Sequence, residues 1–200
     1  MEEKPAMESQ KEAQVNMGKW LSEAWNLVNQ DFGFYILTAL IYLGVIAILS
    51  STVIGEFIVI GPLTVGYFYI LIRKIRKQET QIGDLSKGFS YFAAAVISNI
   101  LIILFSAIGF SLCIIPGIVV SALYMFTPIF IFEKNMDFWQ AMEASRKLAT
   151  KHIFELSVFA LLLSLITIVG VLACLVGLLI TIPLCFAAIA FAYNDLAESV

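Results

Sequence analysis

Three long apolar runs limit what this chain can fold into. They cover residues 34–72, 91–132 and 153–194, and the charged residues lie mostly between them. A helix crosses the hydrocarbon layer of a membrane with about 20 residues, so each run of roughly 40 residues has room for two crossings and a tight turn. No strand-length segment alternates apolar and polar residues as the strands of membrane β-barrels do. The pattern therefore predicts an all-α, polytopic membrane helical bundle.

The composition agrees with this class of protein. Hydrophobic residues make up 60% of the 200 residues, the mean hydropathy is +0.94, and charged residues account for only 14%, whereas soluble domains carry about 25%. We expect a single membrane domain over residues 15–200, after a disordered polar leader at 1–14 that lacks the features of a signal peptide. Six transmembrane helices, paired as three hairpins, are expected at about residues 34–52, 56–73, 91–109, 113–132, 154–173 and 177–194.

The basic residues predict how the chain faces the membrane. All twelve Lys and Arg lie before the first apolar run or in the two stretches between runs. The turns near 52–56, 109–113 and 173–177 carry none. Because positive charge marks cytoplasmic segments, we expect both long loops and both termini to lie in the cytoplasm.

Amphipathic segments precede the hairpins. Residues 15–30 and 138–153 each place apolar side chains on one helical face and charged or amide side chains on the other, so we expect them to lie in the cytoplasmic membrane interface. Alternatively, they only tether the bundle. The residues that we expect to contact lipid or a partner are Trp20, Trp25, Trp139, Arg146, Lys147 and Lys151.

The sequence offers no chemistry inside the membrane. The interiors of the expected helices contain no Asp, Glu, His, Lys or Arg, and no catalytic or phosphate-binding motif occurs. His152 is the only histidine, and Cys113, Cys174 and Cys185 lack the spacing of a metal site. We therefore expect no catalytic residues, no cofactor and no metal, and the chain is not expected to be an enzyme.

Neutral polar residues remain as candidates for a cavity. They are Thr64, Tyr67, Asn99 and Thr127. An amide in lipid needs a hydrogen-bond partner, so Asn99 is expected to bond another helix, with a substrate contact as the alternative. Pro62 is expected to bend its helix, and Gly66 to let another helix approach closely.

Several short motifs in a fixed order resemble a broad prokaryotic family of uncharacterised six-helix membrane proteins, akin to the membrane domain of glycerophosphoryl diester phosphodiesterases. The motifs are Gly-Pro-Leu-x-x-Gly at 61–66, Gly-Asp-Leu-Ser-Lys-Gly-Phe at 83–89, Pro-Gly-Ile at 116–118, Pro128 to Glu133, Ala141 to Ser145, Leu148 and His152. The resemblance covers about residues 20–195. It implies a multi-pass protein of a prokaryotic plasma membrane with no agreed activity, and a lipid-related role by kinship.

Two hypotheses follow. The first is a non-catalytic membrane component that organises lipid or a membrane partner. The alternative is a passive or partner-energised transporter of a neutral or amphiphilic molecule, which a continuous polar cavity would favour. Membrane lipids are the expected partners, another membrane protein is left open, and nucleic acid is not expected.

Overall fold

The structure is a computed structural model that describes residues 15–49, 53–173 and 176–197, so the expected leader at 1–14 lies outside the described residues. Within the described ranges the chain is helical and contains no strand. The α-helices are α1 (Met17–Gln30), α2 (Phe32–Leu49), α3 (Val53–Ile75), α4 (Phe92–Leu112), α5 (Ile114–Tyr124), α6 (Thr127–Glu133), α7 (Phe138–Thr150), α8 (Ile153–Leu172) and α9 (Leu178–Ala197). A 3₁₀ helix, η1 (Ile82–Tyr91), leads directly into α4.

Six stretches of the described chain are long and apolar enough to cross a membrane, which confirms the expected number of spans. Four are α2, the Phe57–Ile75 part of α3, α8 and α9, one combines η1 with α4, and one combines α5 with α6. They indicate a multi-pass membrane protein. The pairing into three hairpins and the side of the membrane on which each turn lies remain predictions.

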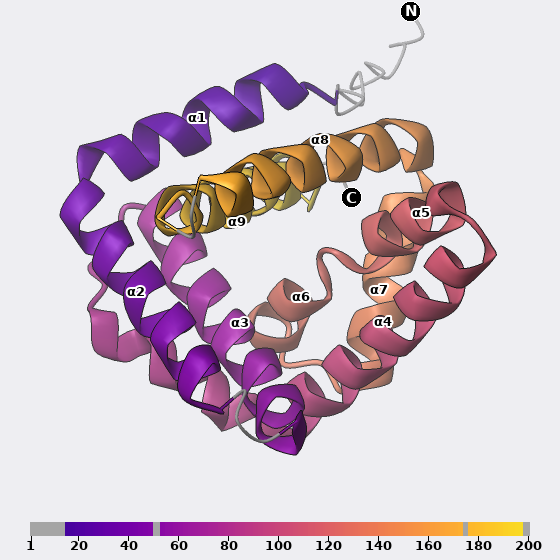
Figure 1. The fold of residues 1–200 in the computed structure, drawn as a ribbon, viewed down its shortest axis with the longest axis horizontal. Coiled ribbons are helices and arrows are strands. Elements are labelled where there is room, and N and C mark those ends of the chain that lie inside the picture. Colours follow the sequence, from indigo (N-terminus) through magenta and orange to yellow (C-terminus); the bar gives the residue numbers. More distant parts are fainter. Residues whose placement is uncertain (1–14, 50–52, 174–175, 198–200) are drawn as a thin grey trace, which may run out of the picture.

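The long helices form a ring when the molecule is viewed down its shortest axis (Figure 1). Helix α3 contacts α2, α4, α6 and α9, while α5 contacts both α7 and α8. Of the apolar window in α3, 56% of the residues are buried, against at most 39% in any other span. Helix α3 is therefore the most buried of the six spans.

Glycines allow η1 to lie against α3. A Cβ atom on Gly66 would come within 2.0 Å of the carbonyl oxygen of Leu85, and one on Gly88 within 1.9 Å of the carbonyl oxygen of Pro62. Any larger side chain at either position would push the two backbones apart. The expectation that Gly66 permits a close helix approach is confirmed.

The expected span at 113–132 is confirmed as Ile114–Glu133, but it is not one continuous helix, because the chain breaks between α5 and α6. Ser145 of α7 stabilises this break: its Oγ accepts a hydrogen bond from the backbone N–H of Phe126 at 3.2 Å and donates one to the carbonyl of Leu123 at 2.8 Å. Pro128 lies in the first turn of α6, where a missing N–H costs nothing. A side chain from another helix thus replaces hydrogen bonds that a continuous helix would make itself.

Candidate functional site

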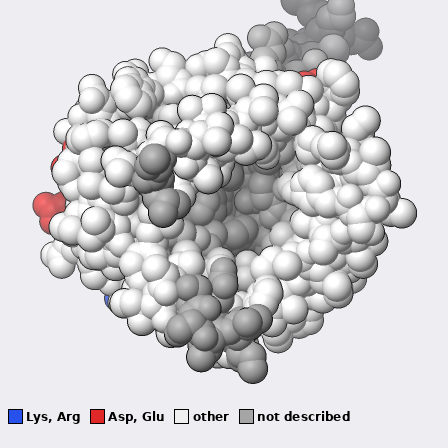
Figure 2. All heavy atoms as spheres, viewed as in Figure 1, with Lys and Arg blue, Asp and Glu red and all other residues white. Residues whose placement is uncertain are grey.

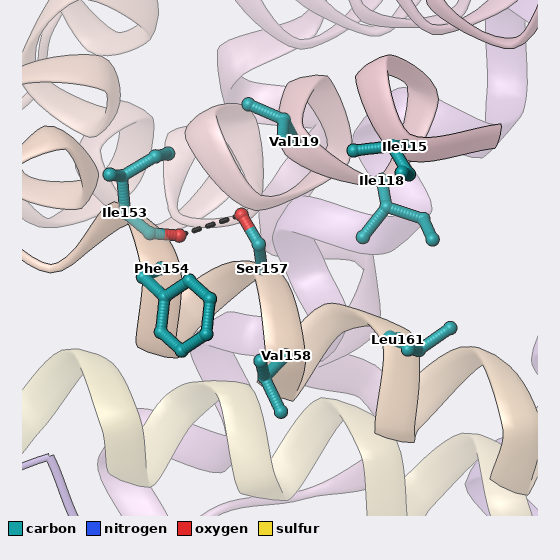
Figure 3. Close-up of a pocket in the computed structure, with 8 residues that line it drawn as sticks. All are labelled: Ile115, Ile118, Val119, Ile153, Phe154, Ser157, Val158 and Leu161. Carbon is teal, nitrogen blue, oxygen red and sulfur yellow. Dashed lines mark hydrogen bonds between the residues drawn. The ribbon is translucent and has the colours of Figure 1, made fainter. Parts of the chain in front are cut away.

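A groove of about 330 Å³ lies between α5 and the first turns of α8. Its lining residues come from these two helices (Figure 3) and are Ile115, Ile118, Val119, Ile153, Phe154, Ser157, Val158 and Leu161. Seven of the eight are apolar. The eighth, Ser157, donates its hydroxyl to the carbonyl of Ile153 at 2.6 Å, so the groove offers no free polar group to a ligand.

The walls of the groove are open to the surroundings. Phe154 is 76% exposed and Ile115 is 71% exposed. In water, such side chains would form an unfavourable apolar surface. On membrane-spanning helices the same surface meets hydrocarbon, so the groove fits an apolar chain.

Two charged residues near the start of α8 are free of ion pairs within the described part of the chain. Lys151 and Glu155 are both exposed, and neither forms an ion pair with another described residue. They flank Ile153 and Phe154 in the sequence. Neither Lys151 nor Glu155 lines the groove.

Two basic residues of α7 that we expected to contact lipid, Arg146 and Lys147, instead pair with Glu143 of the same helix. Arg146 donates two hydrogen bonds to the carboxylate of Glu143, at 2.8 and 2.9 Å, and the ammonium of Lys147 lies 3.6 Å from it. The hydrogen bond from Arg146 is the main cause that holds the pKa of Glu143 below its usual value. All three side chains lie at the protein surface, so this cluster neutralises part of its own charge.

Two of the three expected interfacial tryptophans lie on the surface. Trp25 is 48% exposed and Trp139 is 59% exposed. Trp20 is completely buried: its ring packs edge-on against Phe159 at 5.2 Å, and its Nε1 donates a hydrogen bond to Asp195 at 2.7 Å. The expectation that Trp20 contacts lipid or a partner is therefore corrected, because this side chain joins α1 to α8 and α9.

The polar residues expected in a cavity do not line the α5–α8 groove. The Thr64 hydroxyl lies 3.1 Å from the hydroxyl of Tyr42. The hydroxyls of Tyr67 and Thr127 and the Nδ2 of Asn99 are buried and have no hydrogen-bond partner in the described part of the chain. The side-chain Nδ2 of Asn99 therefore does not donate the hydrogen bond to another helix that we expected.

One face of the molecule is hollowed at its centre, and charged side chains are visible only near its edges (Figure 2). This is the face seen in Figure 1, with the ring of helices around the hollow. No charged side chain is visible inside the hollow in this view.

The described residues contain no group of three or more His, Cys, Asp or Glu that could hold a metal ion. Cys113 is exposed and Cys185 is buried, while Cys174 lies outside the described residues. His152 is partly exposed and precedes α8.

Comparison with known proteins gives no match: no family model, curated protein or solved structure is significantly similar to this chain. The site is therefore interpreted from its own residues.

Sequence reasoning missed the groove itself. Phe154 and Val158 have the same residue types as any lipid-facing position, and nothing in their spacing distinguishes them. Only the pairing of α5 with α8, which are distant in the sequence, shows that these side chains face a second helix.

Proposed function

We propose that this chain is a non-catalytic, multi-pass protein of a prokaryotic plasma membrane that organises lipid, and that the groove between α5 and α8 holds a lipid acyl chain. The six helices cross the membrane as three hairpins, with both termini in the cytoplasm. The resemblance to the uncharacterised six-helix family supports the prokaryotic origin only through its sequence motifs.

The composition of the groove carries this proposal. Hydrocarbon chains are recognised by apolar surface alone, and the lining offers only apolar atoms and one hydroxyl that is already bonded. A volume of about 330 Å³ is at the lower end of ligand pockets, which span roughly 300–1,000 Å³. It suits a single chain segment better than a bulky ligand.

The cytoplasmic orientation rests on charge and on one contact. The ammonium of Lys19 lies 3.0 Å from the carboxylate of Asp195, so the two ends of the described chain lie on the same side of the bundle. The basic residues of the leader and long loops favour the cytoplasm for that side. Trp25 and Trp139, exposed on α1 and α7, would then lie at the inner headgroup layer.

Native mass spectrometry of phospholipid that co-purifies with the protein tests the proposal. Val158→Trp fills the groove with a larger side chain and should lower the number of bound phospholipids. Val171→Trp is the matched control, because Val171 lies on the same helix and is exposed, yet does not line the groove. Equal lipid retention by the two folded variants would refute the proposed site.

A second candidate function is passive or partner-energised transport of a neutral or amphiphilic molecule. The uncharged hollow in Figure 2 and the unpartnered hydroxyls of Tyr67 and Thr127 favour it. Transport requires that a polar path continue from this hollow to the opposite face. Uptake of small neutral solutes into liposomes that contain the purified protein distinguishes the two functions.

A further inference from the structure

We propose that a polar pocket at the end of α3 binds a phosphate group, carried either by a lipid headgroup or by a soluble phosphate compound. The pocket shares no residue with the α5–α8 groove, so this inference does not rest on the proposed function. Its volume of about 490 Å³ lies within the range of ligand pockets, roughly 300–1,000 Å³. The lining residues are Lys74, Lys77, Gln78, Glu79, Thr80 and Gln81.

The pocket lies where the chain leaves a membrane-spanning stretch. The span in α3 ends at Ile75, and the lining comes from the end of that helix and from the connection to η1. Charged side chains are costly in the hydrocarbon layer and lie instead at the level of the headgroups. Both a headgroup phosphate and a phosphate dissolved in water can therefore reach the pocket.

Backbone hydrogen bonds fix both ends of this connection. At the end of α3, Lys77 adopts a left-handed backbone with a φ of 56°, and its N–H donates a hydrogen bond to the carbonyl of Lys74 at 3.0 Å. At the start of η1, the N–H of Gln81 donates a hydrogen bond to the carboxylate of Asp84 at 2.9 Å. The chain itself thus shapes the pocket before a ligand binds.

One lysine of the pocket is held in place and the other is free. The ammonium of Lys74 lies 2.8 Å from the carboxylate of Asp31 and 4.7 Å from the centre of the Phe34 ring. Lys77 is exposed and forms no ion pair with another described residue. Its ammonium is available to an anion, and lysine binds phosphate as a point charge in many proteins.

The hydroxyl of Thr80 lacks a partner within the described part of the chain. Its Oγ1 is buried and makes no hydrogen bond there, and a buried polar atom without a partner costs free energy. Because Thr80 lines the pocket, a bound phosphate oxygen can accept the hydrogen bond that this hydroxyl donates. The side-chain amides of Gln78 and Gln81 supply further donors.

Glu79 distinguishes an anion site from a cation site. It is the one carboxylate among the lining residues. Its charge repels a phosphate and attracts a cation. Removal of this charge should therefore strengthen the binding of phosphate and weaken the binding of a cation.

Two probes distinguish the sources of the phosphate. Equilibrium dialysis of the purified protein in detergent measures the binding of radiolabelled inorganic phosphate. Native mass spectrometry measures the phosphatidic acid that the protein retains after reconstitution in phosphatidylcholine bilayers. Saturable binding of inorganic phosphate assigns the pocket to a soluble phosphate, whereas retention of phosphatidic acid alone assigns it to a lipid headgroup. Binding of neither probe overturns the proposal.

Charge variants locate the site of the probe that binds. Lys77→Gln should lower its affinity about two- to fivefold, the size of one exposed ion pair, and Glu79→Gln should raise it by a similar factor. Lys134→Gln is the matched control, because Lys134 is also exposed but does not line the pocket. Equal effects of Lys77→Gln and Lys134→Gln, or a loss of affinity in Glu79→Gln, overturn the phosphate assignment.

Thr80→Val separates a binding role from a structural role. Valine keeps the shape of threonine and removes the hydroxyl, so the variant should bind the same probe about two- to tenfold more weakly. Its unfolding temperature without the probe should not fall, because the lost hydroxyl has no hydrogen bond within the described chain. A lower unfolding temperature with unchanged affinity would show a purely structural hydroxyl and remove Thr80 from the proposed site.

Discussion

The indole Nε1 of Trp20 donates a hydrogen bond to the carboxylate of Asp195 at 2.7 Å, and so ties the first described helix to the last. Trp20→Phe removes this donor and keeps most of the aromatic contact with Phe159. We expect the free energy of unfolding to fall by about 1.5 kcal/mol, since a hydrogen bond to a charged group is lost. Trp25→Phe, at an exposed position on the same helix, should change it little. Thermal unfolding in detergent measures the stability of both variants. Equal losses of stability in Trp20→Phe and Trp25→Phe would contradict the hydrogen bond between Trp20 and Asp195.

The close contact between α3 and η1 predicts opposite effects for the same substitution at two glycines. Gly66→Ala places a Cβ 2.0 Å from a backbone oxygen of Leu85, whereas a Cβ on Gly44 meets no atom within 4 Å. Gly66→Ala should cost about 1–3 kcal/mol or more through overpacking. Gly44→Ala should be neutral or stabilise by up to about 1 kcal/mol, because alanine is the better helix former. Similar unfolding temperatures for Gly66→Ala and Gly44→Ala would contradict the close contact between α3 and η1.

The break between α5 and α6 depends on one hydroxyl. Ser145→Ala leaves the N–H of Phe126 and the carbonyl of Leu123 without this partner, and we expect a loss of about 1–3 kcal/mol. Ser164→Ala serves as the control, because the Ser164 hydroxyl only bonds a carbonyl of its own helix. Chemical denaturation can compare them. If the free energy of unfolding falls no further in Ser145→Ala than in Ser164→Ala, the break between α5 and α6 does not depend on Ser145.

The sequence was informative wherever local composition decides the outcome. Long apolar runs suffice to locate the spans, since any stretch of about 20 such residues is stable in lipid only as a helix. The sequence did not predict features that depend on a side chain far away in the chain. Within the expected span 113–132 the chain breaks where Ser145 of another helix bonds the backbone, and no local pattern connects that residue to the break.

The tryptophans of α1 show the same limit at the candidate site. Trp20 and Trp25 are five residues apart, about 140° around a helix, so they cannot both point the same way. The amphipathic pattern of residues 15–30 led us to expect both in the membrane interface, and only the packing of α1 on α9 shows which one is buried.

The two candidate functions predict opposite signs for one substitution. If the bundle is packed without a polar path, the Tyr67 hydroxyl is buried without a partner, and Tyr67→Phe should raise the free energy of unfolding by about 1–3 kcal/mol. Tyr42→Phe, which removes a hydroxyl that pairs with Thr64, should lower it by about 1 kcal/mol. A loss of stability in Tyr67→Phe would mean that water or a solute bonds this hydroxyl, in favour of transport.

The most direct measurement of the central claim uses a phospholipid with a photoreactive group in its acyl chain. After illumination of the reconstituted protein, the cross-linked peptides are identified by mass spectrometry. We predict that cross-links concentrate on Val119, Val158 and Leu161, which line the groove. Ile103 and Leu104 are also exposed on a membrane-spanning helix but lie outside the groove, so cross-links to them at equal frequency would contradict a lipid held between α5 and α8.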